Sequence, residues 1–304
     1  MRMDNQEESS NVEDVRGASG GGGGFRPIHG VGLGTIVIAL IAGWVFHISP
    51  LQVLALLSGG GTDSTQSTPA PAAAASSTDG SAGTAGTATE DPQVKFVSQI
   101  LRSTETVWTD VFKANGQVYQ DPKLKLFRDS YPTGCGQGEA AAGPFYCPND
   151  GIIYLDLSFF DQLAQQLGAP GQFAQAYVIA HEVGHHVQDQ LGILSKVDAV
   201  RERSSDATSN ALSVRIELQA DCFAGVWANR SQQEQGWRLE SGDIESALNA
   251  ASQIGDDTLQ RRARGTVVPE SFTHGTSAER VAWFKRGFQG GRIDSCDTLN
   301  AKQL

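Results

Sequence analysis

The chain has 304 residues, of which 39% are hydrophobic and 19% are charged, and its formal net charge is −11. So acidic a chain does not attract phosphate backbones, which excludes nucleic acid as an expected partner. The length allows one or two domains.

Composition divides the first 92 residues into three segments. Residues 1–30 are polar and Gly-rich, and we expect a disordered N-terminus there. Residues 31–57 are apolar and uncharged apart from an interruption near Pro50. Because a bilayer crossing needs about 20 apolar residues, this segment predicts a single transmembrane helix. Residues 58–92 are rich in Gly, Ser, Thr and Ala without a periodic apolar face, which indicates a flexible linker.

The distribution of basic residues predicts the orientation of this span. Three arginines precede it, and no Lys or Arg follows it before Lys95. The positive-inside rule then places the N-terminus in the cytoplasm and the rest of the chain outside. The alternative is a cleaved signal peptide, with the Ala-rich residues 70–75 near the cleavage site.

Four cysteines are present, and an extracytoplasmic compartment would allow them to form disulfides. Cys135 and Cys147 are close in sequence and are the preferred pair, which leaves Cys222 with Cys296. The alternative is four buried free thiols.

Residues 93–304 have a globular composition and predict a helix-rich α+β domain. Residues 131–150, rich in Gly and Pro, are expected to be a loop. Two capping boxes are expected, Ser158 with Asp161 and Thr276 with Glu279. Periodicity and turn residues predict strands over 124–127 and 152–157, and helices over 94–112, 158–168, 171–194, 210–230, 243–254 and 276–288.

The expected helix over 171–194 contains the sequence HEVGH at residues 181–185. Residues four apart on an α-helix lie only about 40° apart around the axis and about 6 Å apart along it. His181 and His185 can therefore bind one metal ion from a single helical face. Glu182 lies beside that face, where it can act as a general base on a water molecule without binding the metal.

A second expected helix carries Glu217 and Asp221, again four residues apart. Glu217 can complete a His2Glu ligand set, which favours one Zn²⁺ per chain and leaves the fourth position for water. Asp221 would accept a hydrogen bond from the outer ring nitrogen of a ligand, best His181. His186 points away from the metal face and is expected to be a supporting or core histidine.

These motifs, with GPFYCPNDGIIYLDLSFF before them and SFTHGTSAERVAWFKRGF after them, resemble the neutral zinc metallopeptidase family of bacterial membrane-anchored proteins. The resemblance covers roughly residues 93–304. It implies a zincin-like fold of the gluzincin type. A peptide or protein is the substrate expected from the metal-site motifs, and the domain is expected outside the bacterial cytoplasmic (inner) membrane. More distantly, the chain is similar to thermolysin and to CAAX-prenyl-protease-like zinc peptidases, although Gly275 stands where the latter have Pro after the histidine.

The expected mechanism is peptide hydrolysis, with zinc polarising a water and Glu182 as general base. His274 is the candidate donor to the oxyanion, and Arg280 and Tyr154 are further substrate-binding candidates. The zincin resemblance implies that the strand over 152–157 is an edge strand to which a peptide adds. The alternatives are an inactive zinc-binding scaffold in the cell envelope and a zinc hydrolase of non-peptide amides, such as cell-wall cross-links.

Overall fold

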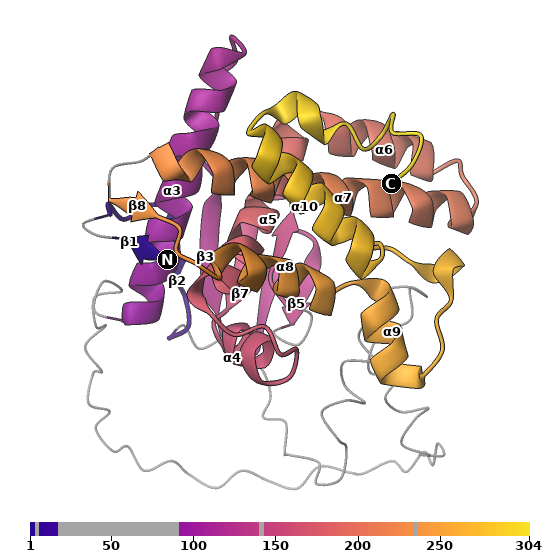
Figure 1. Ribbon diagram of the computed structural model, residues 1–304, viewed down its shortest axis with the longest axis horizontal. Coiled ribbons are helices and arrows are strands. Elements are labelled where there is room, and N and C mark those ends of the chain that lie inside the picture. The colour runs from indigo at the N-terminus through magenta and orange to yellow at the C-terminus, as the bar shows by residue number, and fades with distance from the viewer. Residues whose placement is uncertain (4–5, 18–90, 140–142, 234–235) are drawn as a thin grey trace, which may run out of the picture.

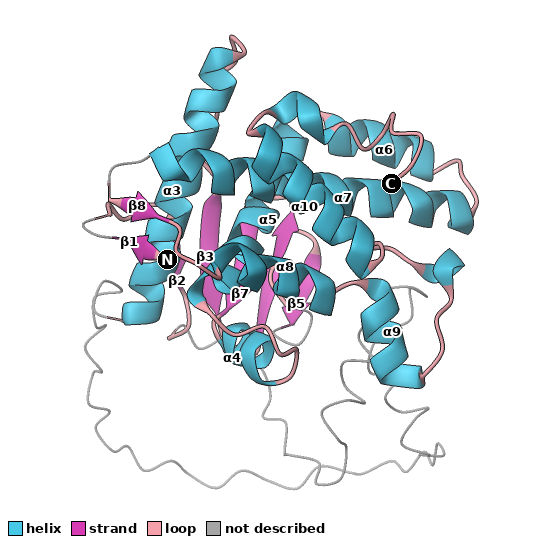
Figure 2. Ribbon diagram, in the orientation of Figure 1, coloured by secondary structure: helices cyan, strands magenta, loops and turns pink. Residues whose placement is uncertain are grey.

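The computed structural model describes residues 1–3, 6–17, 91–139, 143–233 and 236–304 (Figure 1). The predicted transmembrane segment 31–57 and residues 58–90 of the predicted linker lie outside the described residues. Among the described helices, none is both long enough and apolar enough to cross a bilayer. The described part is α+β, with many helices and small sheets (Figure 2), as the sequence predicts.

The first long helix, α3, spans Pro92–Ala114 and confirms the helix expected over 94–112. It begins where Asp91 accepts a hydrogen bond from the backbone N–H of Gln93, with Pro92 in the first turn, where a missing N–H costs nothing. Residues 91 and 92 therefore belong to the domain rather than to the linker. The apolar face of α3 enters the main core through Val97, Ile100, Leu101, Trp108 and Val111.

A four-stranded sheet has the order β2-β3-β7-β6, in which β2, β3 and β7 are parallel and β6 is antiparallel to β7. β3 (Lys123–Phe127) and β7 (Ile152–Asp156) confirm the two expected strands. The prediction that β7 is an edge strand is wrong, because β3 and β6 (Phe145–Cys147) flank it. β6 occupies one edge of the sheet, in a stretch where the sequence predicts only loop.

The other edge of the sheet is β2 (Val12–Asp14). The prediction of a disordered N-terminus over 1–30 is wrong for residues 1–3 and 6–17, and the others lie outside the described residues. Val12 pairs with Leu124, and residues 1–3 and 6–17 are folded onto the domain. Ser9 is buried, and its hydroxyl donates to Glu105 at 2.5 Å. The side chain of Asn11 donates to the same carboxylate at 2.9 Å. A strand of three residues is too short to show an alternating apolar pattern, and its partner strand β3 lies far along the chain, so the sequence does not reveal β2.

Two further small strand pairs complete the described β structure. β4 (Ser130–Thr133) and β5 (Gly136–Glu139) form a hairpin within the segment predicted as loop. β1 (Arg2–Met3) pairs with β8 (Trp237–Arg238).

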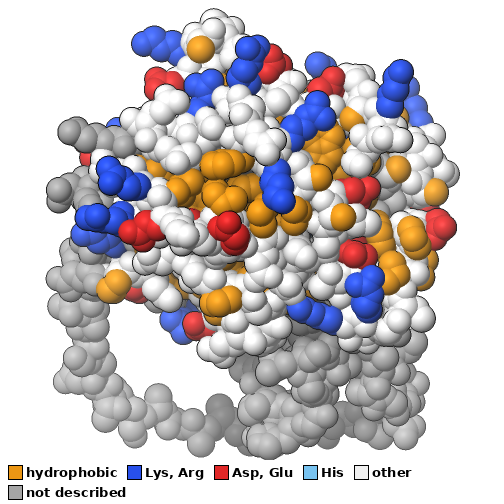
Figure 3. All heavy atoms as spheres, viewed as in Figure 1, with side chains coloured by type: hydrophobic (Ala, Val, Ile, Leu, Met, Phe, Trp, Pro, Cys, Tyr) orange, Lys and Arg blue, Asp and Glu red, His pale blue; other side chains and the backbone are white. Residues whose placement is uncertain are grey.

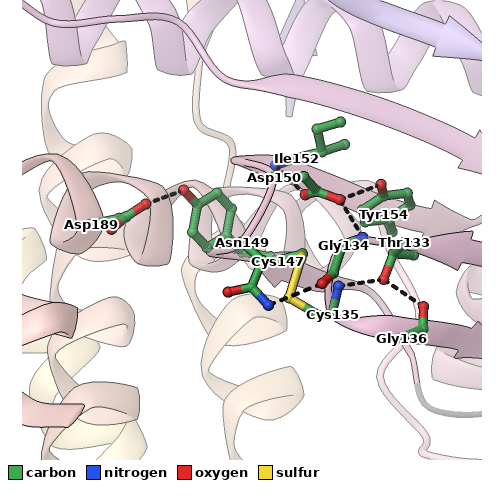
Figure 4. The surroundings of a disulfide bond; sticks show 11 residues. Thr133, Gly134, Cys135, Gly136, Cys147, Asn149, Asp150, Ile152, Tyr154 and Asp189 are labelled. Atoms are coloured by element: carbon green, nitrogen blue, oxygen red, sulfur yellow. Dashed lines mark hydrogen bonds between the residues drawn. A yellow bond between two sulfur atoms is a disulfide. The ribbon is translucent and has the colours of Figure 1, made fainter. Parts of the chain in front are cut away.

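Both preferred disulfides are present. The Cys135–Cys147 bond joins the β4–β5 hairpin to β6, close to the Asp150 carboxylate, which accepts from Gly134 N at 2.7 Å and from the Tyr154 hydroxyl at 2.9 Å (Figure 4). The Cys222–Cys296 bond ties a helix of the core to the C-terminal segment.

Two long helices carry the centre of the main core. α5 (Gln172–Gln190) and α7 (Asp206–Arg230) pack against each other, and α7 also packs along α10 (Ser277–Gly290). The helix expected over 171–194 ends earlier, because Gly192 adopts the left-handed conformation and a separate helix, α6 (Ile193–Arg201), follows. The close crossing of α7 and α10 requires a glycine, since a Cβ at Gly287 would lie 1.9 Å from the carbonyl oxygen of Cys222.

The remaining helices are shorter. The expected Thr276–Glu279 capping box is present at the start of α10. The Ser158–Asp161 box is not: Ser158 is already helical, and its N–H is capped by Asp156 at 2.8 Å. The shorter helices are α4 (Ser158–Gln165), α6 (Ile193–Arg201), α8 (Asp243–Gln253) and α9 (Asp256–Arg264). Single 3-10 turns are present at Ser231–Gln233, Pro269–Ser271 and Ile293–Cys296.

Candidate metal centre

Three potential metal ligands meet between α5 and α7. His181 and His185 lie on one face of α5 with their ring centroids 4.9 Å apart, and Glu217 faces them from α7. One donor atom from each residue lies within 4.8 Å of the other two. The Nε2 atoms of His181 and His185 lie 3.2 Å and 3.5 Å from the two carboxylate oxygens of Glu217. Two imidazoles and one carboxylate form the donor set typical of catalytic zinc.

The hydrogen bonds of the two histidines fit a metal at this point. The Nδ1 atom of His181 lies 2.9 Å from Asp221, and the Nδ1 atom of His185 lies 2.9 Å from the side-chain oxygen of Gln188. An Nδ1–H donor on each ring leaves the Nε2 lone pairs directed at Glu217 and available to an ion. Gln188 in turn donates to the carbonyl of Ile216 on α7 at 2.7 Å. The sequence motif does not reveal Gln188, because its role depends on the neighbouring helix.

The electrostatics of the site also favour a cation. Burial lowers the pKa of His181, but the Asp221 charge and the hydrogen bonds that the ring donates to Asp221 and Glu217 outweigh it and raise that pKa to about 10. The same carboxylates would stabilise a metal ion in place of the proton.

Asp221 belongs to a buried polar cluster behind His181. It accepts two hydrogen bonds from the guanidinium of Arg280, at 2.8 Å and 2.9 Å, and a third from the hydroxyl of Tyr177. Burial alone would raise the pKa of Asp221, but the charges of Arg280 and His181 hold it below its usual value. Asp221 is therefore an ionised acceptor for His181, as the sequence predicts.

Arg280 does not occupy the position expected of it. We expected it to contact substrate, but only 2% of its surface is exposed, and it lies behind His181 paired with Asp221. An arginine fits this place because its planar group can satisfy both carboxylate oxygens at once.

Glu182 lies next to the three ligands and is buried. Burial raises its pKa to about 7, the charge of Glu217 acts in the same direction, and the charge of His181 opposes it. The backbone of Tyr146, on the edge strand β6, lies near enough to the carboxylate to act against this rise in pKa. Glu182 is thus positioned next to the site, with a pKa suited to accepting and releasing a proton near neutrality.

The edge strand is held against α5 by a second network, on the helical face that also carries Glu182. The hydroxyl of Tyr146 donates to Asp189 at 2.7 Å, and Nε2 of His186 lies 2.8 Å from the carbonyl oxygen of Gln120 (Figure 4 shows the Asp189 bond). His186 is therefore a supporting residue outside the ligand set, as expected. Tyr154 points to the opposite face of the sheet, where it packs with Phe127, so it does not join the candidate site.

His274 lies in the segment that leads into α10. Its Nδ1 atom is 3.2 Å from Asp256, and Asp256 also accepts the backbone N–H groups of Thr273, His274 and Gly275. Burial lowers the pKa of His274, but the hydrogen bond to Asp256 and the charges of Glu217 and Asp256 raise it above its usual value. His274 therefore lies near enough to Glu217 for their charges to interact. The sequence analysis missed Asp256, which has no motif of its own.

Comparisons with known proteins agree with this geometry. The family model described as putative neutral zinc metallopeptidase matches residues 1–299. YpfJ of Escherichia coli (strain K12) is 48% identical over 304 residues, covering 98% of this chain and 99% of YpfJ. Mb2605 of Mycobacterium bovis is 40% identical over 211 residues, covering 66% of this chain and 69% of Mb2605. No solved structure matches the chain. With a family model that spans nearly the whole chain, this protein belongs to the putative neutral zinc metallopeptidase family.

Proposed function

We propose that this protein is a zinc-dependent endopeptidase that hydrolyses peptide bonds with Glu182 as general base. The observation that carries the proposal is the meeting of His181, His185 and Glu217 beside the buried carboxyl group of Glu182. An ion bound by the three ligands would act as a Lewis acid on water and on the scissile carbonyl.

Glu182 would carry the proton through the reaction. In its ionised form it accepts a proton from the attacking water, and it then donates this proton to the leaving amine. A pKa near neutrality suits both transfers, because neither protonation state is strongly disfavoured. The nearby Tyr146 backbone favours the ionised form of the carboxylate, the form that accepts the proton.

His274 is the proposed donor to the oxyanion that forms when water attacks the carbonyl. A donor for this role must stay protonated and must be oriented before the reaction. Asp256 meets both requirements, because it raises the pKa of the His274 ring and also accepts a hydrogen bond from the backbone N–H of His274. Asp256 is thus a positioning residue.

The edge strand β6 is the proposed support for an extended peptide. The sequence analysis expected the strand over 152–157 to bind the peptide, but β7 lies inside the sheet and has no free edge. β6 brings its Tyr146 backbone to Glu182 and ends the sheet on the side of α5. A peptide added along this edge would place its carbonyls beside the metal ligands.

We propose an extracytoplasmic location for the domain. Both cysteine pairs are disulfides, and such bonds persist in oxidising compartments. The pairing of β2 with β3 adds a condition: residues 12–14 and 124–126 must lie on the same side of any membrane. A single crossing by residues 31–57, with the N-terminus in the cytoplasm, would separate them. We therefore place residues 1–17 in the same compartment as the domain, with the apolar segment associated with the bilayer.

The test uses the full chain in detergent, because a fragment starting at residue 93 would lack β2. Zinc content and cleavage of a fluorescently labelled unfolded protein are measured for the wild type and for Glu182→Gln. The proposal expects one zinc per chain in both, with cleavage in the wild type, its loss on chelation, and a loss of at least about a hundredfold in the variant. Zinc without cleavage in the wild type favours a scaffold or a non-peptide amide substrate. A chain that binds no zinc overturns the ligand assignment.

A further inference from the structure

A small cavity lies between α6 and α7, directly beside the candidate metal centre. Its volume is about 120 Å³. It is lined by residues of α6, by residues of α7 and by one residue of the segment before α10: Leu194, Val197, Asp198, Arg201, Ser213, Ile216, Glu217 and Thr273.

Two lining residues connect the cavity to the proposed chemistry. Glu217 forms part of its wall and is also one of the three candidate metal ligands. Thr273 forms another part and directly precedes His274, the proposed oxyanion donor. Successive residues of an extended peptide are only about 3.3 Å apart. A peptide whose carbonyl lies at the metal would therefore have a neighbouring side chain within reach of this cavity.

The chemistry of the lining selects the kind of side chain. Leu194, Val197 and Ile216 are apolar. The two charged groups of α6, Asp198 and Arg201, are paired with each other at 3.2 Å and are 55% and 40% exposed. Because their charges cancel at the rim of the cavity, neither residue provides an unpaired charge that would bind a charged side chain of the substrate.

The size of the cavity limits which apolar side chains of a substrate can fit. An apolar cavity of about 150 Å³ holds a benzene molecule. A cavity of about 120 Å³ therefore suits a branched aliphatic side chain better than an indole ring.

We propose that this cavity is the specificity pocket of the enzyme and takes the aliphatic side chain of a residue that flanks the scissile bond. The inference rests on the proposed peptidase function and adds the substrate class to it. Substrates are accordingly peptides with leucine, isoleucine, valine or methionine at one fixed position beside the cleaved bond. Val197 and Ile216 set the width of the pocket.

The test is a peptide-library digest with the full chain in detergent, with products identified by mass spectrometry. Val197→Phe fills the pocket, and Ile216→Ala widens it while leaving the backbone carbonyl that binds Gln188. Val200→Phe is the matched control, since Val200 is on the same helix, is 52% exposed and does not line the cavity. Zinc content and melting temperature are recorded for every variant.

We expect wild type and Val200→Phe to prefer aliphatic residues at the same flanking position. Val197→Phe should lose roughly tenfold or more in kcat/KM for leucine there and shift towards alanine or glycine, since one methylene in such a pocket changes rates by about 10–200-fold. Ile216→Ala should gain relative activity towards phenylalanine. Unchanged preferences in both pocket variants, with wild-type cleavage intact, overturn the pocket assignment alone. A wild type that holds zinc but cleaves no peptide overturns the peptidase function and the pocket with it.

Discussion

Arg280 and Asp221 form a buried two-point ion pair directly behind His181, with Nε–Oδ2 and Nη2–Oδ1 distances of 2.8 Å and 2.9 Å. Asp221 in turn accepts from the His181 ring at 2.9 Å, so a residue of α10 fixes a ligand on α5 through a carboxylate on α7. The candidate metal centre therefore depends on the packing of three helices, although only two of them supply ligands.

The first prediction concerns this ion pair. Arg280→Met should leave Asp221 charged and unpaired in the core and lower the free energy of unfolding by about 3–5 kcal/mol. It should also weaken zinc binding by about 10–100-fold, because the orientation of His181 is lost. Denaturant unfolding and competition with a zinc chelator measure the two effects. The control is Arg286→Met, a nearby exposed arginine of α10. Equal zinc affinity in Arg280→Met and wild type would contradict this role.

The second prediction concerns the pH dependence given by Asp256. The pKa of His274 is above its usual value because of Asp256 and Glu217, so His274 stays protonated, and able to donate, to higher pH than a free histidine. Asp256→Asn keeps an acceptor for the backbone N–H groups but removes the charge, so the pKa of His274 should fall. The alkaline limb of kcat/KM should then move to lower pH, with zinc content unchanged. An alkaline limb at the same pH in both proteins would remove His274 from the mechanism.

The third prediction concerns the contribution of the N-terminal segment to stability. Ser9→Ala removes a buried hydroxyl that donates to Glu105, so the free energy of unfolding should fall by about 1–3 kcal/mol. Ser10→Ala, at the exposed neighbouring residue, should change it by less than about 0.5 kcal/mol. Thermal or denaturant unfolding of the full chain in detergent measures both. Two equally stable variants would show that residues 6–17 do not belong to the folded domain in solution.

The fourth prediction concerns membrane topology. The described cysteines are all in disulfides, so single cysteines can be introduced at the exposed residues Ser10 and Val118 and labelled specifically. Because β2 pairs with β3, a membrane-impermeant maleimide applied to intact spheroplasts should label Ser10→Cys and Val118→Cys equally. Labelling of Val118→Cys alone would support a single crossing with a cytoplasmic N-terminus and would contradict the pairing of β2.

Local sequence patterns predicted the parts of the site that lie within one helix or at one helix end. His181 and His185 come together because four residues make about one helical turn, and Glu217 and Asp221 share a face for the same reason. The capping box at Thr276 was predictable because its two hydrogen bonds join residues only three apart.

Pairings between distant segments could not be predicted in this way. β2 joins β3 across more than 100 residues, and β6 rather than β7 lies at the sheet edge, because strand order depends on which apolar faces pack together. The sequence analysis predicted that Arg280 contacts substrate, but the crossing of α7 and α10 places it behind Asp221.

The sequence by itself therefore determined the chemistry carried by α5, since helix geometry alone brings His181 and His185 together and places Glu182 beside them. Glu217 reaches the histidines only because α7 packs against α5. Only the tertiary structure decided which groups surround that chemistry: the edge strand at Glu182, the Asp256 partner of His274, and the cavity beside Glu217. The physical reason is that these relations arise from packing between elements far apart in the chain, whereas apolar periodicity reports only which face of a single element is buried.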